Sequence, residues 1–111
     1  MIRLYGIKNC DTVKKAANHL KNQGTEYEFV DFKKTPPTKV ELQRWKKFLG
    51  DWPVNPRGRT YKAMKNEFES ATESEKQQML IENTSLIKRP ILENAERPIC
   101  FGYDKEIFEG V

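Results

Sequence analysis

The sequence predicts an α/β (α+β) domain with a mixed four-stranded sheet, in the order β-α-β, a helical insertion, and β-β-α. Three observations lead to this fold class. A strand-helix-strand pattern occupies residues 2–32, helix signals occupy most of residues 35–85, and two β-prone runs joined by a polar turn follow. A length of 111 residues suits one domain with a modest core.

Composition is typical of a globular protein. Apolar residues make up 37% and charged residues 32% of the chain, and aromatic residues occur along its whole length. No apolar run is long enough to cross a membrane and the N-terminus lacks a secretion signal, so we expect a cytoplasmic protein without membrane contact. Two distant cysteines and a single histidine predict neither a disulfide framework nor a metal site.

The net charge of +4 is unevenly distributed along the chain. Residues 1–65 hold 15 of the 20 Lys and Arg residues but only 6 of the 16 Asp and Glu residues. Such a split is typical of an anion-binding half, and it is equally typical of ordinary solvated helix faces. Charge alone leaves both interpretations open.

The first part of the chain predicts a βαβ unit. Residues 2–5 form a short β-prone run that Gly6 closes. Apolar residues then recur at helical spacing, which predicts a helix from about Asp11 to Gln23, and a second strand is expected at residues 27–32. Two strands joined through a helix in this way are parallel.

The middle of the chain predicts a helical insertion. Consecutive prolines at 36–37 cannot continue a strand. Thr38 and Glu41 form a capping box that begins a helix ending at Gly50. Residues 51–59 contain two prolines and predict a loop, which either closes over a site or simply connects two helices.

Two further helices are expected before the second half of the sheet. One is a short helix at residues 61–68, and the other begins behind a second capping box, Thr72 with Glu75. The insertion should end at about Asn83, where the pattern changes.

The last part of the chain predicts a β-hairpin and a final helix. A strand should begin near Pro90, a polar turn should occupy residues 93–96, and a second strand should span residues 97–103. Asp104 can cap a short helix after that strand. A βαβ unit followed by a ββα unit in one sheet is the thioredoxin-like arrangement.

Cys10 is the candidate nucleophile. It lies between the first strand and the first helix, where free backbone N–H groups and the helix dipole stabilise a thiolate. Lys8, Lys14 and Lys15 add positive charge nearby, and both effects lower the pKa of a cysteine. The alternative is a small buried residue that closes the turn.

His19 and Cys100 are not expected to act as a catalytic base or as a second nucleophile. His19 lies nine positions along the helix from Cys10, roughly 13 Å at 1.5 Å per residue, so we interpret it as a surface residue and not as a base. Cys100 lies in the last predicted strand, where a small buried residue is the favoured interpretation. A role in resolving an oxidised Cys10 stays open. Such a disulfide needs Cα atoms within about 7 Å, and the sequence does not give this distance.

Three motifs occur in order along the chain: YGIKNCDTVKKA at residues 5–16, KTPPT at residues 34–38 and LIKRPIL at residues 86–92. Together they resemble the arsenate reductase (ArsC)-like family, and the first is most similar to its YffB-type, Spx-related branch. The resemblance implies a single thioredoxin-like domain, 1–111. It divides the domain into a core and a helical insertion, with boundaries at about 1–34 and 86–111 for the core and 35–85 for the insertion.

The resemblance also supports Cys10 as the nucleophile, and it implies a cis peptide bond before Pro90 that brings Arg89 close to it. Two departures matter. Spx-type regulators carry a C-x-x-C switch, whereas Val13 occupies the position of the second cysteine here. Arsenate reductases of the family carry Cys-x-x-Ser-Arg and bind the oxyanion with three arginines, of which only Arg89 has a clear match.

Asn55 and Gly102 align with the other two arginine positions. Arg57 and Arg59 lie close enough in sequence to Asn55 to supply one of the missing side chains through the loop.

We therefore predict a glutathione-dependent monothiol reductase, with glutathione as co-substrate, no bound cofactor and no metal. The alternatives are an Spx-like module that binds RNA polymerase, and a true arsenate reductase. Glutaredoxin is a further candidate partner, nucleic-acid binding is a weaker option, and we expect a monomer. The expected substrate-binding residues are Asn9, Lys14, Asn55, Arg57, Arg59, Arg89 and Pro90.

Overall fold

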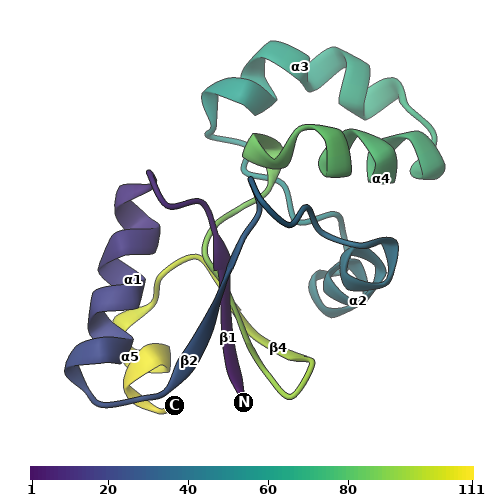
Figure 1. The fold of residues 1–111 in the computed structure, drawn as a ribbon. Helices are drawn as coiled ribbons and strands as arrows, with labels where there is room; N and C mark the ends of the chain where they lie inside the picture. Colours follow the sequence, from purple (N-terminus) through teal and green to yellow (C-terminus); the bar gives the residue numbers. More distant parts are fainter. The chain divides into compact units, whose positions relative to one another are not determined.

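The computed structural model describes residues 1–111 and contains one four-stranded sheet in the order β2-β1-β3-β4 (Figure 1). The strands are β1 (Ile2–Gly6), β2 (Tyr27–Asp31), β3 (Ile91–Asn94) and β4 (Arg97–Phe101). β1 pairs parallel with β2 and antiparallel with β3, and β3 pairs antiparallel with β4. The predicted mixed sheet is confirmed.

Five α-helices and one short 3₁₀ helix complete the fold. They are α1 (Asp11–Asn22), α2 (Lys39–Leu49), α3 (Arg59–Ser70), α4 (Glu73–Glu82), η1 (Thr84–Leu86) and α5 (Lys105–Glu109). None of the helices is long and apolar enough to span a membrane.

The chain divides into two compact units. The first combines Met1–Thr35 with Arg89–Val111 and holds the sheet, α1 and α5. The second is Pro36–Lys88 and holds α2, α3, α4 and η1.

The core of the first unit lies between one face of the sheet and two helices, α1 and α5 (Figure 1). Alternate positions of β1 point to this face, as expected for a pleated strand. Helical spacing places Ala16 and Leu20 of α1 against the same face. The buried cluster consists of Ile2, Leu4, Ala16, Leu20, Leu92, Cys100 and Phe108.

The junction between β1 and α1 is tightly packed. A Cβ atom added to Gly6 would lie 2.7 Å from Cγ2 and 3.0 Å from Cγ1 of Val13. Val13 is only 2% exposed, so its branched side chain has little room to move aside. Because Gly6 has no side chain, β1 can end directly against the first turn of α1.

The second unit contains both predicted capping boxes. The Thr38 hydroxyl accepts from the Glu41 N–H at 3.1 Å, and the Thr38 N–H donates to the Glu41 carboxylate at 2.9 Å. Thr72 and Glu75 form the same pair of bonds at 3.2 and 2.9 Å. Gly50 ends α2 with a φ of 83°, a left-handed conformation that glycine adopts without strain.

Two predicted element boundaries were wrong, one in each unit. The loop ends at Gly58, because α3 begins at Arg59 and runs to Ser70 instead of covering only residues 61–68. In the first unit, the second strand ends at Asp31, one residue before the predicted end.

The predicted hairpin is confirmed, but its turn is shorter than the predicted residues 93–96. Glu93 and Asn94 belong to β3, and the chain reverses at Ala95 and Glu96, whose φ values are 51° and 64°. Two-residue hairpin loops favour positive φ at both positions because this matches the twist of the strands, and the sequence offers no glycine to mark it. Glu93 is buried and accepts a hydrogen bond from the Tyr5 hydroxyl at 3.0 Å.

Asp104 caps the final helix as predicted. Its carboxylate accepts from the N–H groups of Glu106 at 3.0 Å and Ile107 at 3.3 Å, so α5 begins immediately after it. The second predicted strand of the hairpin ends at Phe101, two residues earlier than expected.

We expect Gly6→Ala to lower the free energy of unfolding by about 1–3 kcal/mol, the usual cost of overpacking. Urea denaturation measures this value. The cost should be partly relieved in Gly6→Ala/Val13→Ala, because the added methyl group then occupies space that Val13 vacates.

Gly110→Ala is the matched control. There the atom nearest to an added Cβ is the Ile107 carbonyl oxygen at 3.5 Å, an ordinary contact. Its effect should stay within about 0.5 kcal/mol. Equal costs at both glycines, or additive costs at Gly6 and Val13, would contradict the close-packing argument.

Candidate functional site

Cys10 is the N-cap residue of α1. Its backbone is extended, with φ −96° and ψ 122°, and its side chain is partly exposed. The N–H groups of Val13 and Thr12, in the first turn of the helix, lie close to the Cys10 thiol and lower its pKa, although the side chain makes no capping hydrogen bond. These N–H groups have no partner within the helix, so they are available to stabilise negative charge on sulfur.

Arg89 supplies the positive charge at this site. Its guanidinium lies close enough to the Cys10 thiol to lower the pKa of that thiol, although the two residues are far apart in the sequence. The peptide bond between Arg89 and Pro90 is cis, as the family resemblance implied. Pro90 itself is buried, and its carbonyl oxygen accepts from the Gly102 N–H at 2.7 Å.

The pKa of Cys10 reflects opposing effects. Burial is the largest and raises the pKa. The N–H group of Val13, the guanidinium of Arg89 through its donors and its charge, and the N–H group of Thr12 all lower it. Together these three residues outweigh burial, and the pKa of Cys10 lies below its ordinary value.

The three lysines expected to assist Cys10 are exposed: Lys8, Lys14 and Lys15. Lys14 and Lys15 lie on different sides of α1, since each lines a different pocket. The lowered pKa rests on the helix N–H groups and Arg89. Asn9, immediately before Cys10, is also exposed.

Asn55, Arg57 and Arg59 belong to the second unit, and their participation in the Cys10 site stays a prediction. The Asn55 side chain accepts from the Arg57 N–H at 3.2 Å, and its carbonyl accepts from the Gly58 N–H at 3.0 Å. Asn55 thus shapes the turn of its own loop. Both arginine side chains are exposed.

Cys100 is 7% exposed and lies in the core cluster of the first unit, as predicted. Its Sγ donates to the Gly102 carbonyl oxygen at 3.2 Å. Neither Cys100 nor Cys10 forms a disulfide in this structure.

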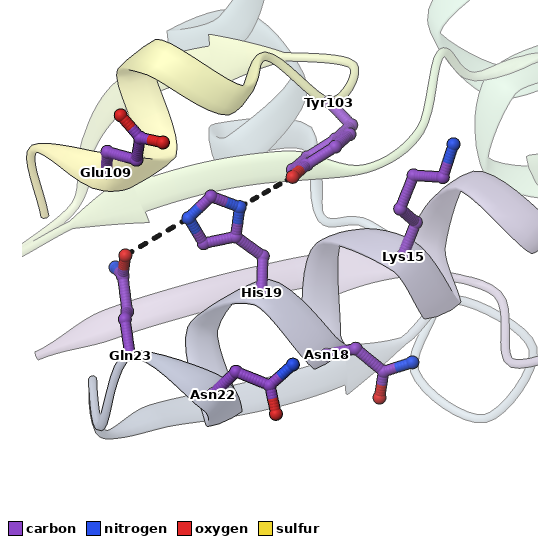
Figure 2. Close-up of a pocket in the computed structure, with 7 residues that line it drawn as sticks. All are labelled: Lys15, Asn18, His19, Asn22, Gln23, Tyr103 and Glu109. Carbon is purple, nitrogen blue, oxygen red and sulfur yellow. Dashed lines mark hydrogen bonds between the residues drawn. The ribbon is translucent and has the colours of Figure 1, made fainter.

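His19 lies half-buried on the surface of α1, and it has hydrogen-bond partners that the sequence did not predict. Figure 2 shows its ring between Tyr103 and Gln23 in an open pocket of about 550 Å³. Nδ1 lies 2.5 Å from the Tyr103 hydroxyl and Nε2 lies 3.1 Å from Gln23 Oε1. Gln23 in turn donates to the Phe108 carbonyl at 2.8 Å, so His19 belongs to a network that joins α1 to α5.

A second pocket was missed by the sequence analysis. It is a groove of about 270 Å³ beside the first turn of α1. Its lining residues are Lys8, Val13, Lys14, Ala17, Tyr27 and Phe29. The sequence patterns predicted the helix and the strand to which most of these residues belong. Only the packing of α1 beside β2 brings their side chains together.

Comparison with known proteins gives consistent results. An uncharacterized protein of Haemophilus influenzae is 38% identical over 101 residues, covering 83% of this chain and 82% of its own. The crystal structure of a possible arsenate reductase from Streptococcus mutans has a TM-score of 0.78 at 27% identity, covering 93% of this chain and 91% of that one. A YffB protein has a TM-score of 0.84 at 28% identity, covering 99% and 97%.

These neighbours share the thioredoxin-like α/β architecture described above. The family model for ArsC matches residues 5–111, from the end of β1 through Cys10, Arg89 and the last helix. With this match over nearly its whole length, the chain belongs to the ArsC family.

Proposed function

We propose that this protein is a thiol-based reductase in which Cys10 exchanges disulfides with glutathione. The observation that carries the proposal is the set of donors at one partly exposed sulfur, two helix N–H groups and the Arg89 guanidinium, which lower the pKa of Cys10. A thiolate is the nucleophilic form of cysteine in disulfide exchange. Membership of the ArsC family and the arsenate-reductase-like neighbours support a thiol-based redox function.

The reaction proceeds through one mixed disulfide. The Cys10 thiolate attacks the glutathione sulfur of a substrate–S–S–glutathione disulfide, forming a Cys10–glutathione disulfide and releasing the substrate as a thiolate. A second glutathione thiolate then attacks the glutathione sulfur bound to Cys10. This step releases glutathione disulfide and restores the Cys10 thiolate, so in the net reaction one substrate sulfur is reduced and one glutathione sulfur is oxidised.

An external thiol is needed because the chain offers no local resolving cysteine. Val13 occupies the position where a C-x-x-C motif has its second cysteine, and Cys100 is buried. Glutathione is anionic overall, so Arg89 and Lys14 are suitable partners for its carboxylates. Asn9 and the Pro90 backbone complete the proposed contacts in the first unit, and the arsenate assay below tests Asn55, Arg57 and Arg59 of the second unit.

Such a reductase would work in the cytoplasm, where a glutathione pool keeps thiols reduced. Glutaredoxin is the proposed partner for regenerating Cys10 when the substrate is not itself glutathionylated. The RNA-polymerase-binding alternative has no specific observation in its favour.

Oxidised glutathione should modify Cys10 alone. We expect mass spectrometry at neutral pH to find one glutathione adduct on the intact protein, mapped to Cys10 after digestion. Cys10→Ser should abolish the adduct and Cys100→Ser should retain it, because Cys100 is buried. Modification of Cys100 with Cys10 untouched would overturn the proposal.

Arg89→Met should raise the pKa of Cys10, since it removes the donor groups and the positive charge that lower it. Iodoacetamide alkylation followed against pH measures this. Wild-type Cys10 should stay reactive as the pH falls below the ordinary thiol range, whereas the variant should lose reactivity earlier. Arg97→Met, at an exposed arginine of β4, is the matched control, and identical profiles for all three proteins would refute the role of Arg89.

Arsenate reduction should be slow. Each charge-assisted bond from arginine contributes about 1.5–3 kcal/mol, so two missing arginines correspond to roughly two to four orders of magnitude in rate. A glutathione- and glutaredoxin-coupled arsenate assay tests this, with Asn55→Arg as the gain-of-function variant. Gly102→Arg is unsuitable because Gly102 has a φ of 91°.

The opposite result is equally clear. Rapid arsenate turnover by the wild-type protein, lost in Arg57→Gln or Arg59→Gln, would mean that the loop supplies the missing donors.

A further inference from the structure

The groove of about 270 Å³ beside α1 lies in the same unit as Cys10 and has a distinct composition. Its walls are apolar, formed by Val13 and Ala17 of α1 and by Tyr27 and Phe29 of β2. Ala17, Tyr27 and Phe29 are only partly buried, although they pack against the core cluster. An apolar surface of this kind remains available to a ligand.

The groove adjoins the candidate nucleophile through Val13. Val13 lies in the first turn of α1, three residues after the N-cap residue Cys10, and its side chain forms part of the groove wall. Lys8, at the other end of the same turn, precedes Cys10 by two residues and lines the groove as well. A molecule seated there therefore lies against the residues that flank the sulfur.

The charge of the groove selects an anion. Its two charged lining residues are Lys8 and Lys14, both exposed, and its lining includes no carboxylate. A ligand with an apolar group against the aromatic walls and a carboxylate near the lysines would satisfy both features. The volume lies just below the range of about 300–1,000 Å³ that is typical of sites for whole small molecules, so the groove accommodates one ring or branched side chain.

We propose that this groove is the specificity site of the reductase, and that it binds the half of a disulfide substrate that carries an apolar, ring-sized group next to a carboxylate. The inference rests on the proposed function of Cys10. In the reaction, the Cys10 thiolate attacks one sulfur of the disulfide, a new S–S bond forms, and the old S–S bond breaks. The departing thiolate keeps the bonding electron pair, so no additional reductant is needed for this step.

Three small disulfide probes distinguish the contribution of a ligand's carboxylate from that of its aromatic ring. Dithiobis(nitrobenzoate) carries an aromatic ring and a carboxylate on each half, 4,4′-dithiodipyridine carries an uncharged ring, and dithiodiglycolate carries a carboxylate without a ring. Stopped-flow rate constants for Cys10 would be measured with each probe in Cys100→Ser protein. Each variant is compared with its parent on the same probe, which cancels differences in intrinsic probe reactivity.

The Lys8→Glu/Lys14→Glu variant should slow the reaction with dithiobis(nitrobenzoate) by about tenfold more than the reaction with dithiodipyridine. A raised pKa of Cys10 would slow both probes together, so their ratio isolates binding in the groove. Lys15→Glu is the control for charge on α1, because it makes the same substitution as Lys14→Glu on the same helix, half of the charge change in the double variant, and Lys15 lines the other pocket of α1 (Figure 2). Its ratio should stay within about twofold of the parent.

Ala17→Leu should fill the groove without changing its charge. It is expected to slow both aromatic probes by several fold and to leave dithiodiglycolate unaffected. Far-UV circular dichroism verifies the fold of each variant, and the surface lysine variant carries the test if Ala17→Leu does not fold.

The outcomes separate the two proposals. If no probe reacts at Cys10 in the parent protein, the proposed function fails. If all probes react but the probe ratios are the same in the parent, Lys8→Glu/Lys14→Glu and Ala17→Leu proteins, only the groove inference fails. Equal ratio changes in Lys15→Glu would also overturn it, because general charge would then explain the effect.

Discussion

The contact between Gly6 and Val13 is the constraint on which the site depends. Because glycine has no Cβ, the end of β1 approaches the first turn of α1 closely enough for the chain to pass from strand to helix within a few residues. Cys10 occupies that short connection as the N-cap residue, within reach of the helix N–H groups. A bulkier residue at position 6 would press on Val13, in the first turn of the helix that Cys10 caps.

One effect raises the pKa of Cys10, and three neighbouring residues lower it. Partial burial disfavours the thiolate, and it also reduces the water screening that would weaken nearby donors. Two backbone N–H groups and one guanidinium then lower the pKa below its ordinary value without a histidine. His19, the only histidine, is instead held by Tyr103 and Gln23 in the network that joins α1 to α5.

Val13 links the structural and chemical roles of the α1 N-terminus. Its side chain packs against Gly6 and forms one wall of the groove, and its N–H group lowers the pKa of Cys10. It also occupies the place where a C-x-x-C motif has its second cysteine, which leaves Cys10 without a neighbouring thiol. In the proposed reductase, Val13 therefore accounts both for the need for an external thiol and for one wall of the groove that binds the substrate beside Cys10.

The sequence by itself determined the features that arise from short-range interactions. The capping boxes at Thr38 and Thr72 and the position of Cys10 before α1 follow from neighbouring residues, so local patterns predicted them. The order of the elements then implied the mixed sheet. The cis bond before Pro90 and the closeness of Arg89 to Cys10 were anticipated only through the family resemblance.

Only the tertiary structure decided which distant residues meet. The hairpin turns at Ala95 and Glu96 because the pairing of β3 with β4 overrides weak local turn signals, and this pairing places Glu93 in a buried strand. The groove likewise exists only where α1 packs beside β2. Neither contact has a local signature, since each depends on packing between segments that are separated in the sequence.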